Sequence, residues 1–157
     1  TQARLNVTVL TTMMEARLLK GSQKLFEELS EKIDTARMWN SGEFFKAKLD
    51  EQITRHNRYD NTPYNLEPNI KGSPGGLRDI QMISWLARRH LGVTHLDELV
   101  GKGLLTPGQL RILSSGQNFL WKIRFCLHFL TGRREDRLLF DYQIKVAKTM
   151  NEKFLEK

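Results

Sequence analysis

Apolar residues recur at intervals of three and four positions along most of the chain, and almost no stretch alternates apolar and polar residues. The first spacing is typical of amphipathic helices, whereas alternation is typical of strands. The sequence therefore predicts an all-α fold, an antiparallel helical bundle. The predicted helices cover residues 6–20, 43–59, 76–91, 94–100, 106–131 and 136–150, with one more that Ser22 caps.

Three of these helices carry apolar stripes that we expect to be buried. On the helix over 43–59 the stripe is Phe45, Leu49, Ile53 and His56, with Lys48 on the polar face. On the helix over 106–131 a wide stripe indicates deep burial and includes Ile112, Phe119, Ile123, Cys126 and Leu130. On the last helix the stripe is Leu139, Phe140, Ile144 and Ala147. We also expect the tryptophans Trp39, Trp85 and Trp121 to anchor the core.

The helical pattern is interrupted at residues 61–76. Three of the four prolines and three of the eleven glycines lie between positions 63 and 76. Proline and glycine both disfavour the interior of a helix, so this stretch is a long connection. Long connections inside a compact domain tend to be functional. We therefore predict an ordered functional loop between two helices.

Five polar residues in and just after this loop form the candidate binding site: Glu67, Asn69, Lys71, Arg78 and Asp79. Cations beside the N-terminus of a helix favour a bound anion, so a nucleotide-facing role is one interpretation. The alternative is a structural crossover in which Glu67 and Asp79 pair with Lys71 and Arg78. Such surface pairs are common and contribute little stability.

The chain is basic, with a net charge of +7 and a pI of about 9.7. That charge suggests an acidic partner, such as nucleotide phosphates or an acidic protein surface, or simply a solvated basic surface. Because the basic residues are spread along the chain, with no arginine-rich tail, nucleic acid is not expected. No apolar run approaches the roughly 18 residues that span a membrane. The single cysteine, Cys126, excludes an internal disulfide and fits a reducing cytoplasm.

Familiar catalytic motifs are absent from the sequence. There is no Gly-rich phosphate loop, no Gly-x-Ser-x-Gly elbow and no Asp-x-Asp pair for a two-metal centre. None of the four histidines is adjacent to an aspartate in the sequence, and none pairs with another at a spacing of four. We therefore predict neither catalytic residues nor metal ligands within this chain.

Two consecutive motifs resemble a known family. Tyr64-Asn-Leu-Glu-Pro-Asn-Ile-Lys71 and Pro74-Gly-Gly-Leu-Arg-Asp-Ile80 are similar to the signature downstream of the nucleotidyltransferase core in PII-protein uridylyltransferase/uridylyl-removing enzymes. The flanks agree, so the resemblance covers essentially the whole chain. The second motif is also similar to one in glutamine synthetase adenylyltransferase, which stays an alternative, but the Leu-Glu-Pro-Asn half favours the uridylyltransferase.

The resemblance implies a helical substrate-binding domain of a multidomain cytoplasmic regulator of nitrogen metabolism. In that family a nucleotidyltransferase domain uses Mg²⁺ to transfer UMP from UTP to the PII protein, and a hydrolase domain removes it. The chain starts with Thr1, and we expect residues 1–157 to be a single helical domain excised from such a protein and inactive alone. Its expected partners are UTP, PII and the neighbouring nucleotidyltransferase and hydrolase domains.

Two functional hypotheses follow from these observations. In the first, Lys71 and Arg78 face the nucleotide or the incoming PII protein across a cleft whose catalytic carboxylates lie on another domain. In the second, the segment is a non-catalytic scaffold or protein-interaction bundle, and the loop makes no contact with a nucleotide.

Overall fold

The computed structural model describes residues 2–34 and 38–154, and its regular elements are all helices, as the sequence predicts. They are α1 (Gln2–Leu5), α2 (Val7–Met14), α3 (Gln23–Asp34), α4 (Ser41–Asn57), α5 (Leu77–Leu91), α6 (Glu98–Gly101), α7 (Pro107–Thr131) and α8 (Phe140–Phe154). The only β-type pairing among the described residues is an isolated bridge between Asn69 and Arg137.

Helix α7 begins where its capping signal predicts. The Thr106 hydroxyl accepts a hydrogen bond from the Gln109 N–H at 3.2 Å, and the Gln109 side chain accepts one from the Thr106 N–H at 2.8 Å. Pro107 follows at the first helical position, where its missing N–H is not needed. Gly132, with a φ of 64°, ends the helix in the left-handed conformation. Local chemistry therefore determines both ends of this element.

The predicted helix over residues 6–20 is too long, because α2 ends at Met14. The Arg88 guanidinium donates to the Met14 carbonyl at 2.7 Å, and the Trp85 indole N–H donates to the Glu15 carboxylate at 2.9 Å. These contacts from α5 satisfy the end of α2 and take the place of another helical turn. Leu19, which the prediction placed in the helix, is 82% exposed in the connection that follows.

Two later helices start further along the chain than predicted. The Glu98 carboxylate accepts from the Thr94 and His95 N–H groups at 2.9 and 2.8 Å, so α6 begins at Glu98 and not at 94. Residues 136–138 pair with the long loop, so α8 begins only at Phe140. In both cases a hydrogen bond outside the helix replaces the one that a longer helix would form.

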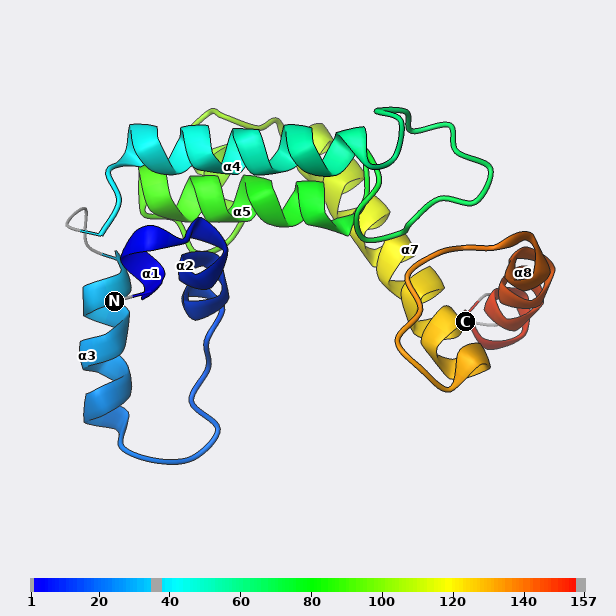
Figure 1. Cartoon of the computed structure of the whole chain (residues 1–157), viewed down its shortest axis with the longest axis horizontal. Coiled ribbons are helices and arrows are strands. Elements are labelled where there is room, and N and C mark those ends of the chain that lie inside the picture. Colours follow the sequence, from blue (N-terminus) through cyan, green and yellow to red (C-terminus); the bar gives the residue numbers. More distant parts are fainter. Residues whose placement is uncertain (1, 35–37, 155–157) are drawn as a thin grey trace.

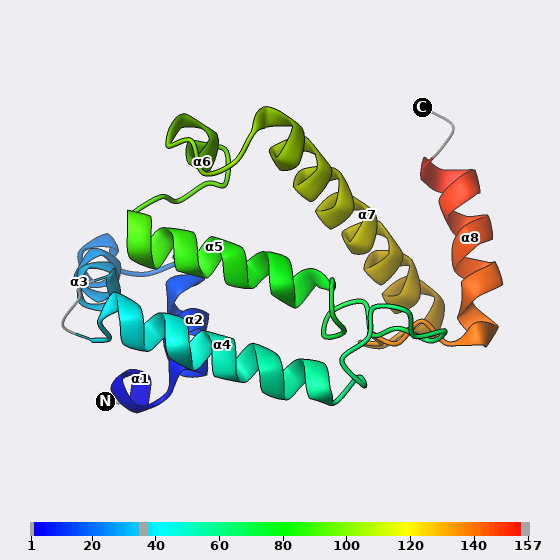
Figure 2. The same ribbon diagram turned by 90° about the horizontal axis from the view of Figure 1, so that it is seen from above.

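Helices α4 and α5 lie side by side and run in opposite directions, with α1, α2 and α3 gathered at one end (Figure 1). Helix α7 runs obliquely from α6 towards the α4–α5 loop at the other end, and α8 packs on α7 (Figure 2). The long loop therefore lies where the α4–α5 pair approaches the α7–α8 pair.

Among the described residues, the buried apolar side chains form three clusters. One joins the first five helices and includes Leu10, Phe44 and Trp85. A small one lies around α6. The third joins α5, α7 and α8 and includes Ile70 of the loop itself, which is 5% exposed. The loop is therefore part of a core, and it ties α5 to α7 and α8.

The buried faces of three helices differ from the predicted ones. On α4 the buried residues are Phe44 and Lys48, while Phe45, Leu49 and Ile53 are 51%, 37% and 50% exposed. Helix α4 meets α2 and α5 through the face that carries Lys48. Periodicity shows which side chains share a face, but it does not show which face a neighbour covers.

The same error affects α7 and α8. Ile123 and Cys126 of the predicted α7 stripe are buried, but Ile112 and Phe119 are 75% and 54% exposed. The tryptophan Trp121 is 42% exposed and does not anchor the core, unlike Trp85. On α8 the predicted residues Phe140, Ile144 and Ala147 are exposed, and Val146 is buried against α7 in their place.

Candidate functional site

The loop before α5 is held by side chains of its own. The Asn69 side-chain oxygen accepts from the N–H groups of Gly72 and Lys71 at 2.7 and 3.2 Å. The Ser73 hydroxyl, in a side chain that is almost fully buried, accepts from the Asn69 N–H at 2.9 Å. Asn69 thus shapes the turn, as asparagine does in many tight turns.

The loop is also tied to the connection between α7 and α8. The Ile70 N–H donates to the Asp136 carbonyl at 2.7 Å, and the Leu138 N–H donates to the Pro68 carbonyl at 2.9 Å. The Glu67 carboxylate accepts from the Phe140 N–H at 2.9 Å and lies 3.4 Å from the Arg137 guanidinium. These contacts place Glu67 in a structural role at the start of α8.

The N-terminus of α5 is closed by the loop that precedes it. The Leu77 N–H donates to the Ile70 carbonyl at 3.0 Å, and the Arg78 N–H donates to the Lys71 carbonyl at 2.9 Å. These donors would otherwise be free to bind an anion. The helix end itself therefore offers no open anion site, and the predicted anion binding depends on the side chains of Lys71 and Arg78.

Asp79 is the anchor of the loop. Its carboxylate accepts from the Gly75 N–H at 2.7 Å, from Arg55 at 2.7 Å and from Gln52 at 3.1 Å, and it lies 3.0 Å from His56. Burial alone would raise the pKa of Asp79, but the hydrogen bonds from Arg55, Gln52, Gly75 and His56 outweigh burial and hold it below its usual range. The acid thus joins the end of α4 to the start of α5.

The two candidate cations have no such partners. Among residues 2–34 and 38–154, neither Lys71 nor Arg78 lies within ion-pair distance of a carboxylate. The alternative prediction, in which Glu67 and Asp79 pair with Lys71 and Arg78, is therefore wrong. Glu67 pairs with Arg137 and Asp79 pairs with Arg55.

Lys71 and Arg78 lie where the α4–α5 pair approaches the α7–α8 pair, and the charges of Arg124 and Arg134 also act on Lys71. Burial is the main cause that lowers the pKa of the Lys71 ammonium, with the charge of Arg78 next, while Asp136 acts in the opposite direction. The Arg78 guanidinium lies 5.3 Å from the centre of the Trp85 ring, a cation–π distance. Partly buried cations that form no ion pair suit an anionic ligand.

Two residues near the loop make contacts that the sequence does not predict. Lys48, assigned to a polar face, is 2% exposed, forms an ion pair with Glu51 at 2.5 Å and lies 4.3 Å from the centre of the Trp85 ring. Arg55 donates to the Gly72 carbonyl at 2.8 Å in addition to binding Asp79. No local signal marks the contacts with Trp85, Gly72 and Asp79, because they join residues far apart in the sequence.

A second acid–base cluster lies beside the loop. The Asp136 carboxylate binds Arg124 at 2.7 Å and lies 3.4 Å from His128. The described part of the chain therefore contains two histidine–aspartate pairs, His56–Asp79 and His128–Asp136. In neither pair are the two residues adjacent in the sequence. Both carboxylates are held by an arginine, which makes them poor ligands for Mg²⁺.

The described residues do not fit a metal ion. In the part of the chain that the structure describes, no three side chains among histidine, cysteine, aspartate and glutamate come together to hold a metal. Among residues 2–34 and 38–154, no helix is both long enough and apolar enough to cross a membrane.

The lowered pKa values of Asp79 and Asp136 predict acid sensitivity. A carboxyl group whose folded pKa is depressed stabilises the fold above its unfolded value of about 3.9, and this stabilisation is lost as the pH falls through the folded value. We expect the melting temperature to fall steeply below about pH 4, and Asp136→Asn to flatten that fall. Melting curves between pH 2 and 7 test this expectation.

The control for the acid experiment is Asp50→Asn, which changes an exposed aspartate of α4. It is expected to keep the acid-induced loss of the parent chain. Equal slopes for the parent chain and Asp136→Asn would contradict the prediction.

Comparisons with known proteins agree with the motifs in the loop. The model of the family described as GlnD PII-uridylyltransferase matches residues 43–154, from α4 to α8. Proteins named bifunctional uridylyltransferase/uridylyl-removing enzyme are similar over 146 residues: 52% identity in Azotobacter vinelandii and 53% in Pseudomonas putida. The alignment covers 93% of this chain but only 16% of each relative. No solved structure matches the chain. The chain therefore belongs to the GlnD PII-uridylyltransferase family.

Proposed function

We propose that this chain is the helical substrate-binding part of a uridylyltransferase that transfers UMP from UTP to the PII protein. Support comes from the family and from the names of its relatives, of which the alignment covers only 16%. Those names also include removal of the uridylyl group. The proposal places the protein in the cytoplasm and gives it the nucleotidyltransferase and hydrolase domains of the same polypeptide as neighbours.

The observation that carries the proposal is the contrast within the loop. The acids Glu67 and Asp79 and the amide of Asn69 bind groups of the protein itself. Among the described residues, neither Lys71 nor Arg78 has an acid within ion-pair distance. A phosphate is the natural complement of two such cations, and Arg is well suited to bind it with two hydrogen bonds.

In this proposal the chain binds and orients the substrates, and another domain performs the transfer of UMP. Lys71 and Arg78 neutralise charge on the nucleotide phosphates or on an acidic segment of PII as it approaches. The Mg²⁺ ion and its carboxylate ligands belong to the nucleotidyltransferase domain, because Asp79 and Asp136 are each held by an arginine. The isolated chain is expected to transfer no UMP.

Arg78→Ala in the full-length enzyme tests the proposal. A charge-assisted contact contributes about 1.5–3 kcal/mol, so we expect the kcat/KM for UTP to fall by about 10-fold to 100-fold. Uridylylation of PII measured over a range of UTP concentrations gives KM and kcat separately. The melting temperature of the variant shows whether the fold is retained.

The matched control is Arg111→Ala, which removes an exposed arginine on α7 away from the loop. It is expected to leave both the activity and the melting temperature as they are. Parent-level activity in a folded Arg78→Ala enzyme would reject the role of this arginine.

A scaffold is the second candidate, and the structural use of three loop side chains favours it. Asn69 shapes the loop, Asp79 connects α5 to α4, and Glu67 connects the loop to α8. If the loop only connects helices, Arg78→Ala will retain full activity, and variants that loosen the loop will lose stability alone. The same kinetic experiment therefore separates the two functions.

A further inference from the structure

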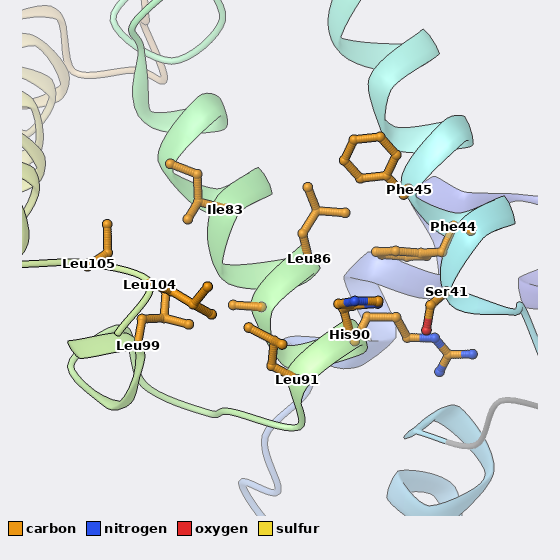
Figure 3. Close-up of a pocket in the computed structure, with 13 residues that line it drawn as sticks. Ser41, Phe44, Phe45, Ile83, Leu86, His90, Leu91, Leu99, Leu104 and Leu105 are labelled. Carbon is orange, nitrogen blue, oxygen red and sulfur yellow. The ribbon is translucent and has the colours of Figure 1, made fainter. Parts of the chain in front are cut away.

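A groove of about 540 Å³ lies between the first half of α4, the second half of α5 and the segment around α6 (Figure 3). Phe45 of α4, Leu86 of α5 and Leu104 after α6 line it. The lining includes neither Lys71 nor Arg78, so the groove is not part of the site described above.

The groove continues into an exposed apolar stripe on α4. Phe45, Leu49 and Ile53, which are 51%, 37% and 50% exposed, follow one another at intervals of four residues. Ile83 of α5, 41% exposed, lines the groove beside them. Folded monomers rarely expose a contiguous apolar surface of this kind unless it binds something. Residues at this spacing form a ridge, and such a ridge packs into a groove on the surface of another helix.

The chemistry of the lining distinguishes a permanent partner from a transient one. Apart from Ser41, Arg89 and His90, the residues around the groove are apolar or glycine. Partners that associate and separate use surfaces about as polar as the rest of the protein, whereas permanent interfaces resemble a core cut in half. PII, as a substrate, has to leave after each reaction, so this apolar groove is poorly suited to bind it.

We propose that the groove and the α4 stripe hold an apolar helical face from another part of the same polypeptide in the full-length enzyme. The chain corresponds to 16% of its relatives, so 84% (100 − 16) of their length lies elsewhere. A tethered partner also binds at a high effective concentration. A second copy of this chain is disfavoured, because each copy carries a net charge of +7.

Cysteine labelling tests the proposal. The native Cys126 is 1% exposed, so the folded chain offers little background to a maleimide reagent. Leu104→Cys and Phe45→Cys are prepared in the 157-residue chain and in the full-length enzyme, and mass spectrometry follows the peptide that carries each new thiol. The rate in the folded protein is divided by the rate in denaturant, which removes differences in intrinsic reactivity.

We expect both thiols to react readily in the 157-residue chain and at least about tenfold more slowly in the full-length enzyme. Leu19→Cys, at a position that is 82% exposed and lies outside the groove, serves as the exposed reference. Equal rates for Leu104→Cys and Phe45→Cys in both proteins would overturn the proposal. So would protection that appears only at high concentration of the short chain, or only after PII is added.

This test does not depend on Lys71 and Arg78. An enzyme in which Arg78→Ala retains full activity can still show protection of the groove. An enzyme with the expected kinetic loss can still leave the groove open. The two proposals therefore fail separately.

Discussion

Replacing Asp79 with alanine is expected to lower the free energy of unfolding by about 3 kcal/mol, more than a typical single substitution. The carboxylate accepts hydrogen bonds from Gly75, Arg55 and Gln52 and contacts His56. The Arg55 side chain is only 14% exposed, so the variant would leave a buried guanidinium without its acid. Removing one partner of such a pair costs more than the pair itself contributes.

Thermal and urea unfolding measured by circular dichroism test this prediction. For a chain of this size, 3 kcal/mol corresponds to a melting temperature about 6–12 °C lower. The matched control is Glu67→Ala, which removes another loop acid whose ionic partner, Arg137, is 58% exposed. That control is expected to cost only about 1 kcal/mol.

A double variant identifies the cause of the loss. Arg55→Leu together with Asp79→Ala removes both charges, so no guanidinium remains buried alone. We expect the double variant to be less destabilised than the sum of its two single variants. Strict additivity would show that the ion pair is not what holds the loop.

Gly76→Ala is the second large effect, at about 3 kcal/mol of lost stability. A Cβ at this position would lie 2.9 Å from the carbonyl oxygens of Ile70 and Ser73 and 3.0 Å from that of Lys71. All three oxygens belong to the backbone and accept hydrogen bonds, from Leu77, Gly76 and Arg78 respectively. They cannot move apart without breaking those bonds. The φ of Gly76 is −77°, so the effect is steric and not conformational.

Gly116→Ala is the matched control, and it is expected to change the stability in the opposite direction when unfolding is measured in the same way. Gly116 lies inside α7, and a Cβ there would have no atom within 4 Å. Alanine in a helix interior is favoured over glycine by about 0.5–1 kcal/mol, so this variant is expected to be slightly more stable. If Gly76→Ala unfolds at the same temperature as the parent chain, the tight closure of the α5 N-terminus does not contribute to stability.

Local chemistry accounts for the parts of the fold that the sequence predicts well. The capping box at Thr106 and the left-handed Gly132 act within four residues of the helix ends that they define. The family motif also lies in one continuous stretch. Among the described residues, no helix lies between Asn57 and Leu77, and Asn69 and Ser73 shape the turn there.

The buried faces could not be predicted in the same way. On α4 Lys48 is buried and Phe45 is exposed, whereas hydropathy alone assigns Phe45 to the interior. The structure buries Lys48 because an acid, Glu51, and an aromatic ring, Trp85, surround its ammonium group. Phe45 remains at the surface, where the proposed neighbouring domain would cover it.

The candidate site shows the same division. The sequence by itself determined that the fold is helical, where α5 and α7 begin, and which polar residues belong to the loop. These properties depend on side chains within a few positions of one another. Only the tertiary structure decided that Asp79 meets Arg55 and that Glu67 meets Arg137, and that, among the described residues, no acid lies within ion-pair distance of Lys71 or Arg78. Charges separated by 24 or 70 positions meet only after the helices pack, and their pairing leaves no periodic trace in the chain.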